Sequence, residues 1–286
     1  MTRYNSPISR RTALRTAASA ALVSVAGCLN NDGDSGTPDD VTDSPDGHGP
    51  LQRVAVEGTT LVVEFSPDAD VDQINLIQPN GELFGTRDVA AGAQRVSFAI
   101  GTSYASGEYS VIALRNGDAL AETLLSIQPD LEIVDMGIGR NQPEKMWNGP
   151  RDEITEEAFV TVENRGSGPD AITKLLFSGD VPYPSDEEGT NYADSDDVSG
   201  IYDPKSESEV NQVVISAGEQ ITVYSSRSPF AFVPGAGTSC TEDEQSGEFE
   251  LALETQVGVL RIANKYDIQY SASSEPDGCD ITLSET

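Results

Sequence analysis

The sequence predicts an all-β protein: two tandem β-sandwiches that follow an N-terminal export signal and a disordered acidic linker. Two observations carry this prediction. Short segments with alternating apolar and polar residues recur from Leu51 onward, which is typical of half-buried strands. No long stretch after that point shows a helical period of 3.6 residues, so nothing in the pattern favours helices.

Residues 1–27 have the composition of an export signal. Their basic residues include Arg10 and Arg11, no acid occurs among them, and the Ala-rich apolar run 16–26 follows. That run is far shorter than the roughly 20 residues that cross a bilayer. The order Arg10-Arg11-Thr-Ala-Leu14 resembles twin-arginine export signals, and this resemblance implies translocation out of the cytoplasm.

The apolar run ends in Val25-Ala26-Gly27-Cys28, which resembles a lipobox. The resemblance implies cleavage before Cys28 and a lipid on its sulfur, which would anchor the chain to the outer face of the cytoplasmic membrane. One lipid chain alone holds weakly, so other contacts would have to help. The alternative is an ordinary signal peptide with a chance cysteine.

Residues 28–50 predict a disordered acidic linker. They contain almost no apolar side chain, and such a composition cannot bury enough surface to become ordered. His48, the chain's single histidine, lies in this tract. A blue-copper centre needs two histidines and a cysteine, and a Ser-His-Asp triad needs a histidine held in the fold. Both kinds of site are therefore excluded.

Residues 51–128 predict a small immunoglobulin-like sandwich, since about seven strands are expected in this span. The turn signals are Pro79-Asn80-Gly81 and Asn116-Gly117, and the second predicts a tight hairpin because Asn-Gly tolerates positive φ. The clearest alternating segments are Thr60 to Phe65, Gln73 to Ile77, Arg95 to Ile100 and Glu108 to Leu114.

Residues 129–286 predict a second, larger sandwich with an acidic insertion at about 180–210. Pro129 marks the boundary. The expected strands are Leu131 to Met136, Glu157 to Asn164, Ile172 to Phe177, Val210 to Ile215, Gln220 to Tyr224, Phe249 to Thr255, Val259 to Ile262 and Tyr266 to Ala272.

Three segments of this second unit, Phe159 to Gly168, Ser216 to Glu219 and Gly247 to Ala252, resemble the extracellular immunoglobulin-like modules related to cell-adhesion domains (CARDB-like). The resemblance covers about half of the exported chain. It implies a sandwich with a binding or spacer role, and it carries no catalytic residues.

The charge balance excludes some partners. The chain has 17 Lys and Arg against 48 Asp and Glu, a net charge of −31, which argues against nucleic acid or an anionic membrane surface as a partner. Self-repulsion is strong in dilute buffer and largely screened at molar salt, where the Debye length is about 3 Å. Together with the export signals, this composition resembles the secreted lipoproteins of halophilic archaea. A cation-storing role is the alternative, but the acids are spread along nearly the whole chain.

Cysteine usage agrees with an exported location. Cys28 is assigned to the lipid, which leaves Cys240 and Cys279 as an even pair. We expect them to form a structural disulfide. No C-x-x-C spacing occurs, so a redox or zinc role is not expected.

One loop is a candidate contact site. Arg140, Lys145 and Arg151 surround Trp147, the only tryptophan. A basic loop with an aromatic side chain in so acidic a protein predicts contact with a glycan or an acidic partner in the envelope. The alternative is that Trp147 packs at the junction between the domains and that the arginines pair with nearby acids.

The acidic insertion contains Asp194-Ser-Asp196-Asp197, and such oxygens can hold calcium. The segment lacks the glycine at the sixth place and the closing glutamate of an EF-hand loop. The sequence therefore favours a solvated, salt-adapted insertion over a specific ion site.

No dinucleotide loop, phosphate loop, nucleophile elbow or metalloprotease motif occurs. We expect no catalytic residue, cofactor or metal, and a non-enzymatic, lipid-anchored surface protein that binds, adheres or spaces. Two alternatives remain open. A solute-capture lipoprotein of a transporter would need two helix-rich lobes around a cleft. A carboxylate-based surface hydrolase would need a cleft with two acids, one with a raised pKa.

Overall fold

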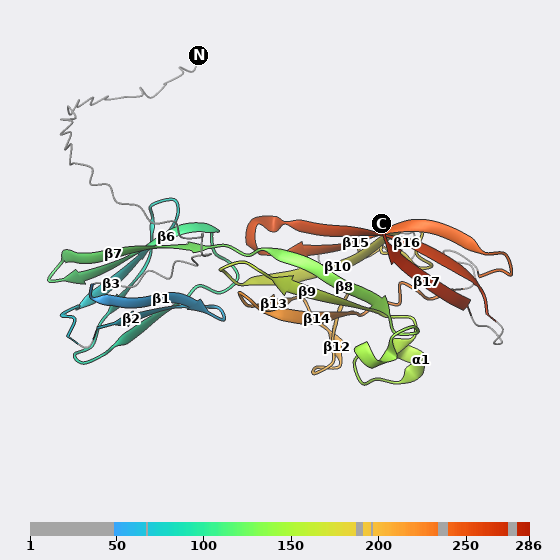
Figure 1. Cartoon of the computed structure of the whole chain (residues 1–286), viewed down its shortest axis with the longest axis horizontal. Helices are drawn as coiled ribbons and strands as arrows, with labels where there is room; N and C mark the ends of the chain where they lie inside the picture. Colours follow the sequence, from blue (N-terminus) through green and yellow to red (C-terminus); the bar gives the residue numbers. More distant parts are fainter. Residues whose placement is uncertain (1–48, 67, 187–190, 196, 234–239, 274–278) are drawn as a thin grey trace, which may run out of the picture. The chain divides into compact units, whose positions relative to one another are not determined.

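The computed structural model describes residues 49–66, 68–186, 191–195, 197–233, 240–273 and 279–286 (Figure 1). The export and lipidation residues Arg10, Arg11, Leu14 and Cys28 lie outside these ranges, as does the predicted linker with His48. All of the described residues belong to one compact unit. No helix in the described ranges is long and apolar enough to span a membrane.

The predicted all-β fold is confirmed. Antiparallel strands make up four sheets, and the helical elements of the described chain are single turns. The bounds of these turns are η1 (Pro143–Lys145), α1 (Arg151–Ile154) and η2 (Val257–Val259).

Strands β1 to β7 form the first sandwich. One of its sheets has the order β1-β2-β5 and the other the order β4-β3-β6-β7. The bounds are β1 (Leu51–Glu57), β2 (Thr60–Phe65), β3 (Gln73–Ile77), β4 (Leu83–Asp88), β5 (Arg95–Ala99), β6 (Gly107–Arg115) and β7 (Asp118–Ile127).

The connections of the first sandwich are those of an immunoglobulin-like domain. The chain passes from β2 to the opposite sheet at β3, adds β4 at its edge, and returns to pair β5 with β2. Tyr109, near the start of β6, donates its hydroxyl hydrogen to the carbonyl oxygen of Ala105 at 2.9 Å. This bond is the tyrosine corner found at the same corner of immunoglobulin-like domains.

The Asn116-Gly117 hairpin between β6 and β7 is also confirmed. Both residues have positive φ, 50° and 86°, and Arg115 pairs with Asp118 across the turn. Two consecutive positive φ values define the type I′ turn, whose twist matches the flanking strands.

Strands β8 to β17 form the second sandwich, with sheets ordered β12-β11-β14-β9-β8 and β13-β10-β15-β16-β17. Strands β8, β9, β14 and β11 face β10, β15 and β16 as in a constant-type immunoglobulin domain, and β12, β13 and β17 extend the edges. The bounds are β8 (Leu131–Ile138), β9 (Ala158–Asn164), β10 (Asp170–Gly179), β11 (Ile201–Asp203), β12 (Ser208–Glu209), β13 (Val213–Ile215), β14 (Gln220–Ser225), β15 (Gln245–Thr255), β16 (Arg261–Ala272) and β17 (Cys279–Glu285).

Cys240 and Cys279 form the predicted disulfide, with an S–S distance of 2.09 Å. It joins the segment before β15 to the first residue of β17. Both cysteines contact the core of the second sandwich.

The insertion at about 180–210 is attached to the sandwich through its apolar and hydroxyl side chains. Tyr192 is buried against Leu176 of β10 and donates its hydroxyl hydrogen to the carbonyl oxygen of Leu175 at 3.2 Å. Asp194 and Asp197 are exposed, while Asp196 lies outside the described residues. The predicted solvated insertion thus agrees with the exposure of these two acids but not with the burial of Tyr192 against the sheet.

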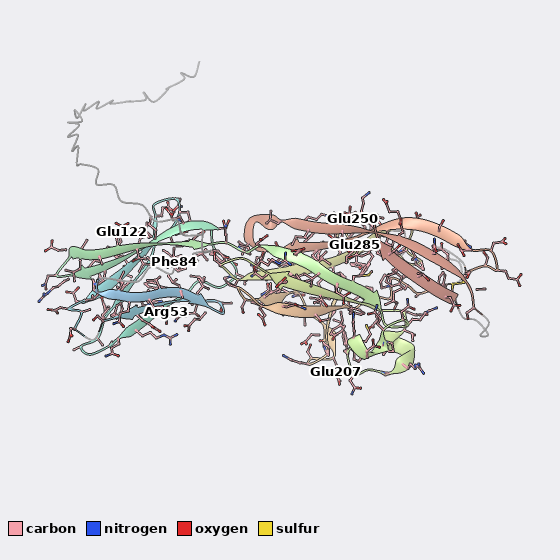
Figure 2. All side chains as sticks on the ribbon, in the orientation of Figure 1. Arg53, Phe84, Glu122, Glu207, Glu250 and Glu285 are labelled. Carbon is pink, nitrogen blue, oxygen red and sulfur yellow. A yellow bond between two sulfur atoms is a disulfide. The ribbon has the colours of Figure 1, made fainter. Side chains whose placement is uncertain are left out.

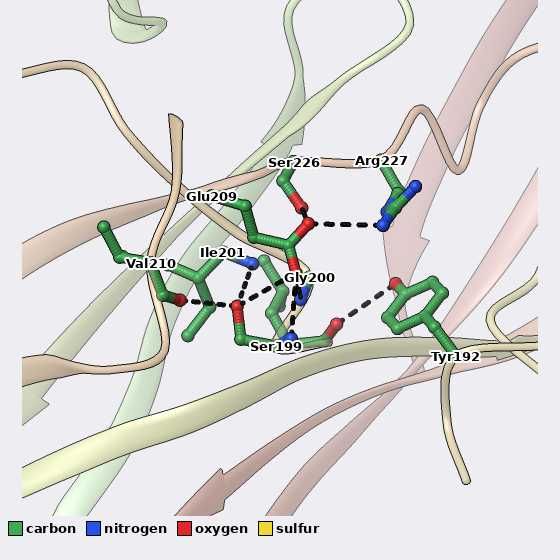
Figure 3. Close-up of polar contacts among 9 residues, drawn as sticks. Tyr192, Ser199, Gly200, Ile201, Glu209, Val210, Ser226 and Arg227 are labelled. Atoms are coloured by element: carbon green, nitrogen blue, oxygen red, sulfur yellow. Dashed lines mark hydrogen bonds and ion pairs between the residues drawn. The ribbon is translucent and has the colours of Figure 1, made fainter. Parts of the chain in front are cut away.

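Glu209 of β12 fastens the end of this insertion (Figure 3). Its Oε1 accepts a hydrogen bond from the backbone N–H of Ser199 at 2.9 Å. Its Oε2 accepts one from the Ser226 hydroxyl at 2.8 Å and lies 3.4 Å from Nη2 of Arg227. No group of three His, Cys, Asp or Glu side chains in the described part of the chain could hold a metal ion.

Candidate functional site

The connection between β8 and β9 covers the outer face of the sheet that contains β9 and β14. Phe159 and Tyr224 are paired neighbours on that face. Met146 and Ile154 bury themselves on Phe159, and Trp147 packs at the edge of the same cluster. Two apolar side chains of this connection, Met146 and Ile154, thus hold it against the sheet.

Trp147 lies against β11 and not at the junction between the two sandwiches. Its ring centroid is 4.6 Å from that of Tyr202, with a tilt of 39° between the planes. Its indole N–H donates to Oε2 of Glu157 at 2.8 Å. The side chain is only partly buried, so part of the Trp147 ring remains at the surface next to Tyr202, while Gly149 lies directly against the ring.

Lys145 is held at the rim of this cluster. Its Nζ lies 2.7 Å from Oδ2 of Asp135 and 5.2 Å from the centre of the Phe159 ring. Both partners of the ion pair are more than 40% exposed, so the pair contributes little to stability. It mainly fixes where the positive charge sits.

Arg140 ties the connection to the opposite sheet. Its Nη1 donates to the carbonyl oxygen of Cys279, and the neighbouring Asn141 donates to the carbonyl oxygen of Ile281 at 2.9 Å. Both acceptors belong to β17. Arg140 is therefore engaged with the backbone of the last strand, whereas Arg151, the first residue of α1, is exposed.

The structure brings together Trp147 and Lys145 from the predicted set and adds Tyr202, which the sequence did not single out. We call Trp147, Tyr202 and Lys145 the aromatic surface. Two adjoining, partly exposed rings offer apolar surface to a sugar or another planar group, and the Lys145 ammonium can pair with carboxylate or sulfate groups. Tyr202 could not be found from sequence because it is 55 positions from Trp147 in a separate strand.

Two of the surface hollows are lined by described residues. One, of about 400 Å³, adjoins Pro50, Asp70 and Arg115. The other, of about 150 Å³, lies between β8 and β17 near Asp135 and Glu285. The hydrolase alternative requires a cleft acid with a raised pKa. Burial does raise the pKa of Asp170, but this residue is fully buried and lines neither hollow.

No protein-family model and no curated protein sequence matches this chain. Several solved structures match this chain. One is a beta-glucuronidase from glycoside hydrolase family 2, at 15% identity and a TM-score of 0.24 over 76% of this chain. A beta-glycosidase from Bacteroides vulgatus matches at 10% identity and a TM-score of 0.20 over 74% of the chain. Escherichia coli alpha-2-macroglobulin matches at 12% identity and a TM-score of 0.21 over 80%. The alignments span 19%, 22% and 22% of those proteins, and no functional argument follows from them.

Proposed function

We propose that this chain is an exported, lipid-anchored, non-enzymatic protein of a halophile's cell surface, in which the two sandwiches bind or space a component of the envelope. The observation that carries the proposal is the Cys240–Cys279 disulfide. Two of the three cysteines are consumed in that bond. The third, Cys28, stands where the apolar run of the signal ends. Disulfides persist in oxidising compartments outside the cytoplasm.

The surface chemistry supports a salt-rich setting. Glu122, Glu207 and Glu285 extend from strands and turns into solvent (Figure 2). Basic side chains are few, and several are paired with acids, such as Lys265 with Glu248 at 2.9 Å and Arg261 with Glu250 at 2.7 Å. Most of the negative charge is therefore left for solvent ions to screen.

Anchoring is tested with the full-length chain expressed in a halophilic archaeon. Cys28→Ser should move the protein from the membrane fraction to the medium, because the lipid acceptor is gone. Ser24→Ala, which keeps the acceptor, should leave it on membranes. Retention of Cys28→Ser on membranes contradicts lipid anchoring.

The export route is tested in the same host. Arg10→Lys together with Arg11→Lys should block export, and unchanged secretion contradicts the twin-arginine route.

The aromatic surface is the proposed contact for the envelope component, a glycan or an acidic partner. The test is a pull-down of envelope fractions with the mature chain at molar salt. Lys145→Ala should lower capture because it removes the positive charge at the rim of this surface, while its exposed ion pair with Asp135 contributes little to stability. Lys265→Ala removes an equal charge from β16, where the lysine is in a similarly exposed pair with Glu248, and should leave capture unchanged. Equal capture by both variants would show that the aromatic surface does not contact the envelope component.

A further inference from the structure

Asp170, the first residue of β10, is fully buried. Its Oδ1 accepts three backbone N–H groups: from Ala171 at 2.7 Å, from Gln256 at 3.2 Å and from Val257 at 2.8 Å. The Gln256 N–H is shared with the carbonyl oxygen of Ala171 at 2.9 Å, whereas the Val257 N–H donates to Asp170 alone within the described chain. The last two donors lie 86 and 87 positions further along the chain. One carboxylate oxygen thus holds the turn that follows β15 against the start of β10.

The turn held by Asp170 reaches into the first sandwich. Val257 is buried in the core of that sandwich, in the cluster that contains Ile100 and Ile127. Gln256 accepts a hydrogen bond from the Thr102 hydroxyl at 2.8 Å and donates to the Ser103 hydroxyl at 2.7 Å. The second sandwich therefore supplies one side chain to the other's core and two polar contacts beside it.

A second tie is made next to Asp170. Tyr104 of the first sandwich donates its hydroxyl hydrogen to the carbonyl oxygen of Pro169 at 2.8 Å. A Cβ added at Gly168 would lie 2.2 Å from that hydroxyl, so only glycine allows this approach. Burial raises the pKa of the Tyr104 phenol, and the Asp170 charge adds to the effect.

The segment between the sandwiches is also fixed by hydrogen bonds. The carbonyl oxygen of Asp130 accepts from the N–H of Arg165 at 2.7 Å, and that of Gln128 accepts from the N–H of Ser167 at 2.8 Å. The short connection is thus bonded to the turn that leads into β10. No free hinge separates the two bodies along this part of the backbone.

Asp170 is a costly residue for this position. Its Oδ2 and the Thr255 hydroxyl are both buried, and neither makes a hydrogen bond of normal geometry within the described chain. The two groups nevertheless interact, because Thr255 lowers the pKa of Asp170 by less than burial raises it. Burying a carboxylate that is not fully paired is unfavourable. An apolar side chain at this position could not accept the backbone N–H groups that bond Oδ1 of Asp170.

We propose that Asp170 is a clamp that couples the two sandwiches, so that they unfold as one cooperative unit. The bonds to Gln256 and Val257 hold the turn in the conformation that plugs the core of the first sandwich. Loss of the clamp uncouples the two bodies and lets the first unfold independently of the second. This property goes beyond the proposed surface role and holds for the mature chain in solution.

The test is pulsed hydrogen exchange with mass spectrometry on the oxidised mature chain, in molar salt and increasing urea. Amides of β2 report the first sandwich and amides of β14 the second. In the wild type, both sets should lose protection at the same urea concentration. In Asp170→Ala, the two midpoints should separate by roughly 1 M urea, because the buried N–H of Val257 loses its acceptor.

The matched control is Asp180→Ala, at the other end of β10. The Asp180 carboxylate also accepts a backbone N–H, that of Glu248 at 3.1 Å, but in a bond within the second sandwich. This variant should keep the two midpoints coincident, even if both shift. Asp170→Asn retains Oδ1 as an acceptor and should also keep them coincident.

Two results overturn the proposal: separate midpoints already in the wild type, or coincident midpoints in Asp170→Ala. If Asp170→Ala does not accumulate as folded protein, the comparison is made with Asp170→Leu. That variant also removes the acceptor of the Val257 N–H but fills the space of the buried side chain. Separated midpoints support the coupling, and coincident ones overturn it.

Discussion

Asn164, at the end of β9, is fully buried and uses both ends of its amide. Its Oδ1 accepts from the N–H of Asp130 at 3.1 Å and of Gly166 at 3.0 Å, and its Nδ2 donates to the carbonyl oxygen of Gly168 at 2.9 Å. These bonds shape the turn before β10 and hold the start of the second sandwich against it. The Asn164 side chain thus bonds the backbone just before β8 as well as the backbone of the turn before β10.

Asn164→Ala should lower the free energy of unfolding by about 2–3 kcal/mol, since buried backbone groups would lose their partners. Urea unfolding at molar salt measures the change. Asn264→Ala is the control, because its amide bonds an exposed carboxylate, that of Glu285, and surface changes usually stay within about 0.5 kcal/mol. Equal effects for the two variants would contradict the role given to Asn164.

Asp170 should make stability depend on pH in a defined direction. Desolvation raises the pKa of this carboxyl above the ordinary value of 3.8, and the hydrogen bonds it accepts lower it by less. A group whose pKa is raised on folding stabilises the protein below its unfolded pKa, and this contribution is lost as pH rises through the folded pKa. Asp170→Asn should therefore gain stability relative to wild type as pH rises from about 4. A difference that does not change with pH would show that the carboxyl is not perturbed.

At the scale of elements, the strands that the sequence predicts best are those with one buried face. The predicted segments Thr60–Phe65 and Gln73–Ile77 coincide with β2 and β3, because their apolar residues alternate toward the core. The strand expected over Val259 to Ile262 begins only at Arg261, since Gly258 with φ of 75° turns the chain there. The expected strand Val210 to Ile215 is paired only from Val213.

Contacts between distant segments were beyond the reach of sequence patterns. Strand β17 was not predicted, although Cys279, Ile281 and Leu283 alternate toward the core, because three such positions at the edge of a sheet make only a short pattern. Two of the groups that bond Asp170, Gln256 and Val257, lie 86 and 87 positions away. A chain with 48 acids offers no reason to select one carboxylate. The Cys240–Cys279 pair was predicted because only one pairing remained once Cys28 was assigned to the lipid.

Removing the disulfide should weaken β17 more than any other strand. In the chain-entropy model, a bond across 39 positions restricts the unfolded chain by about 4 kcal/mol. Cys240→Ser with Cys279→Ser should lower the free energy of unfolding by about that amount and speed amide exchange in β17. Reductant should reproduce the loss in the wild type and have no effect on the variant. Unchanged β17 exchange would contradict this role.

At the scale of the whole molecule, charge governs stability. With a net charge of −31, repulsion reaches about 10 Å in 0.1 M salt but only about 3 Å in 1 M salt. Dilution from molar to 0.1 M salt should therefore lower the thermal midpoint markedly. Sucrose, which does not screen charge, is the control and should not restore it at low salt to the same extent. A midpoint independent of salt would contradict a halophile origin.

The sulfur bridge between Cys240 and Cys279 encloses the β15–β16 hairpin. A protease that nicks the backbone anywhere between those two positions would leave both fragments covalently joined. On a gel without reductant, such a molecule would migrate as an uncut polypeptide, and only a thiol would release the C-terminal piece. A protein with this linkage retains its last strand even after its backbone has been cut.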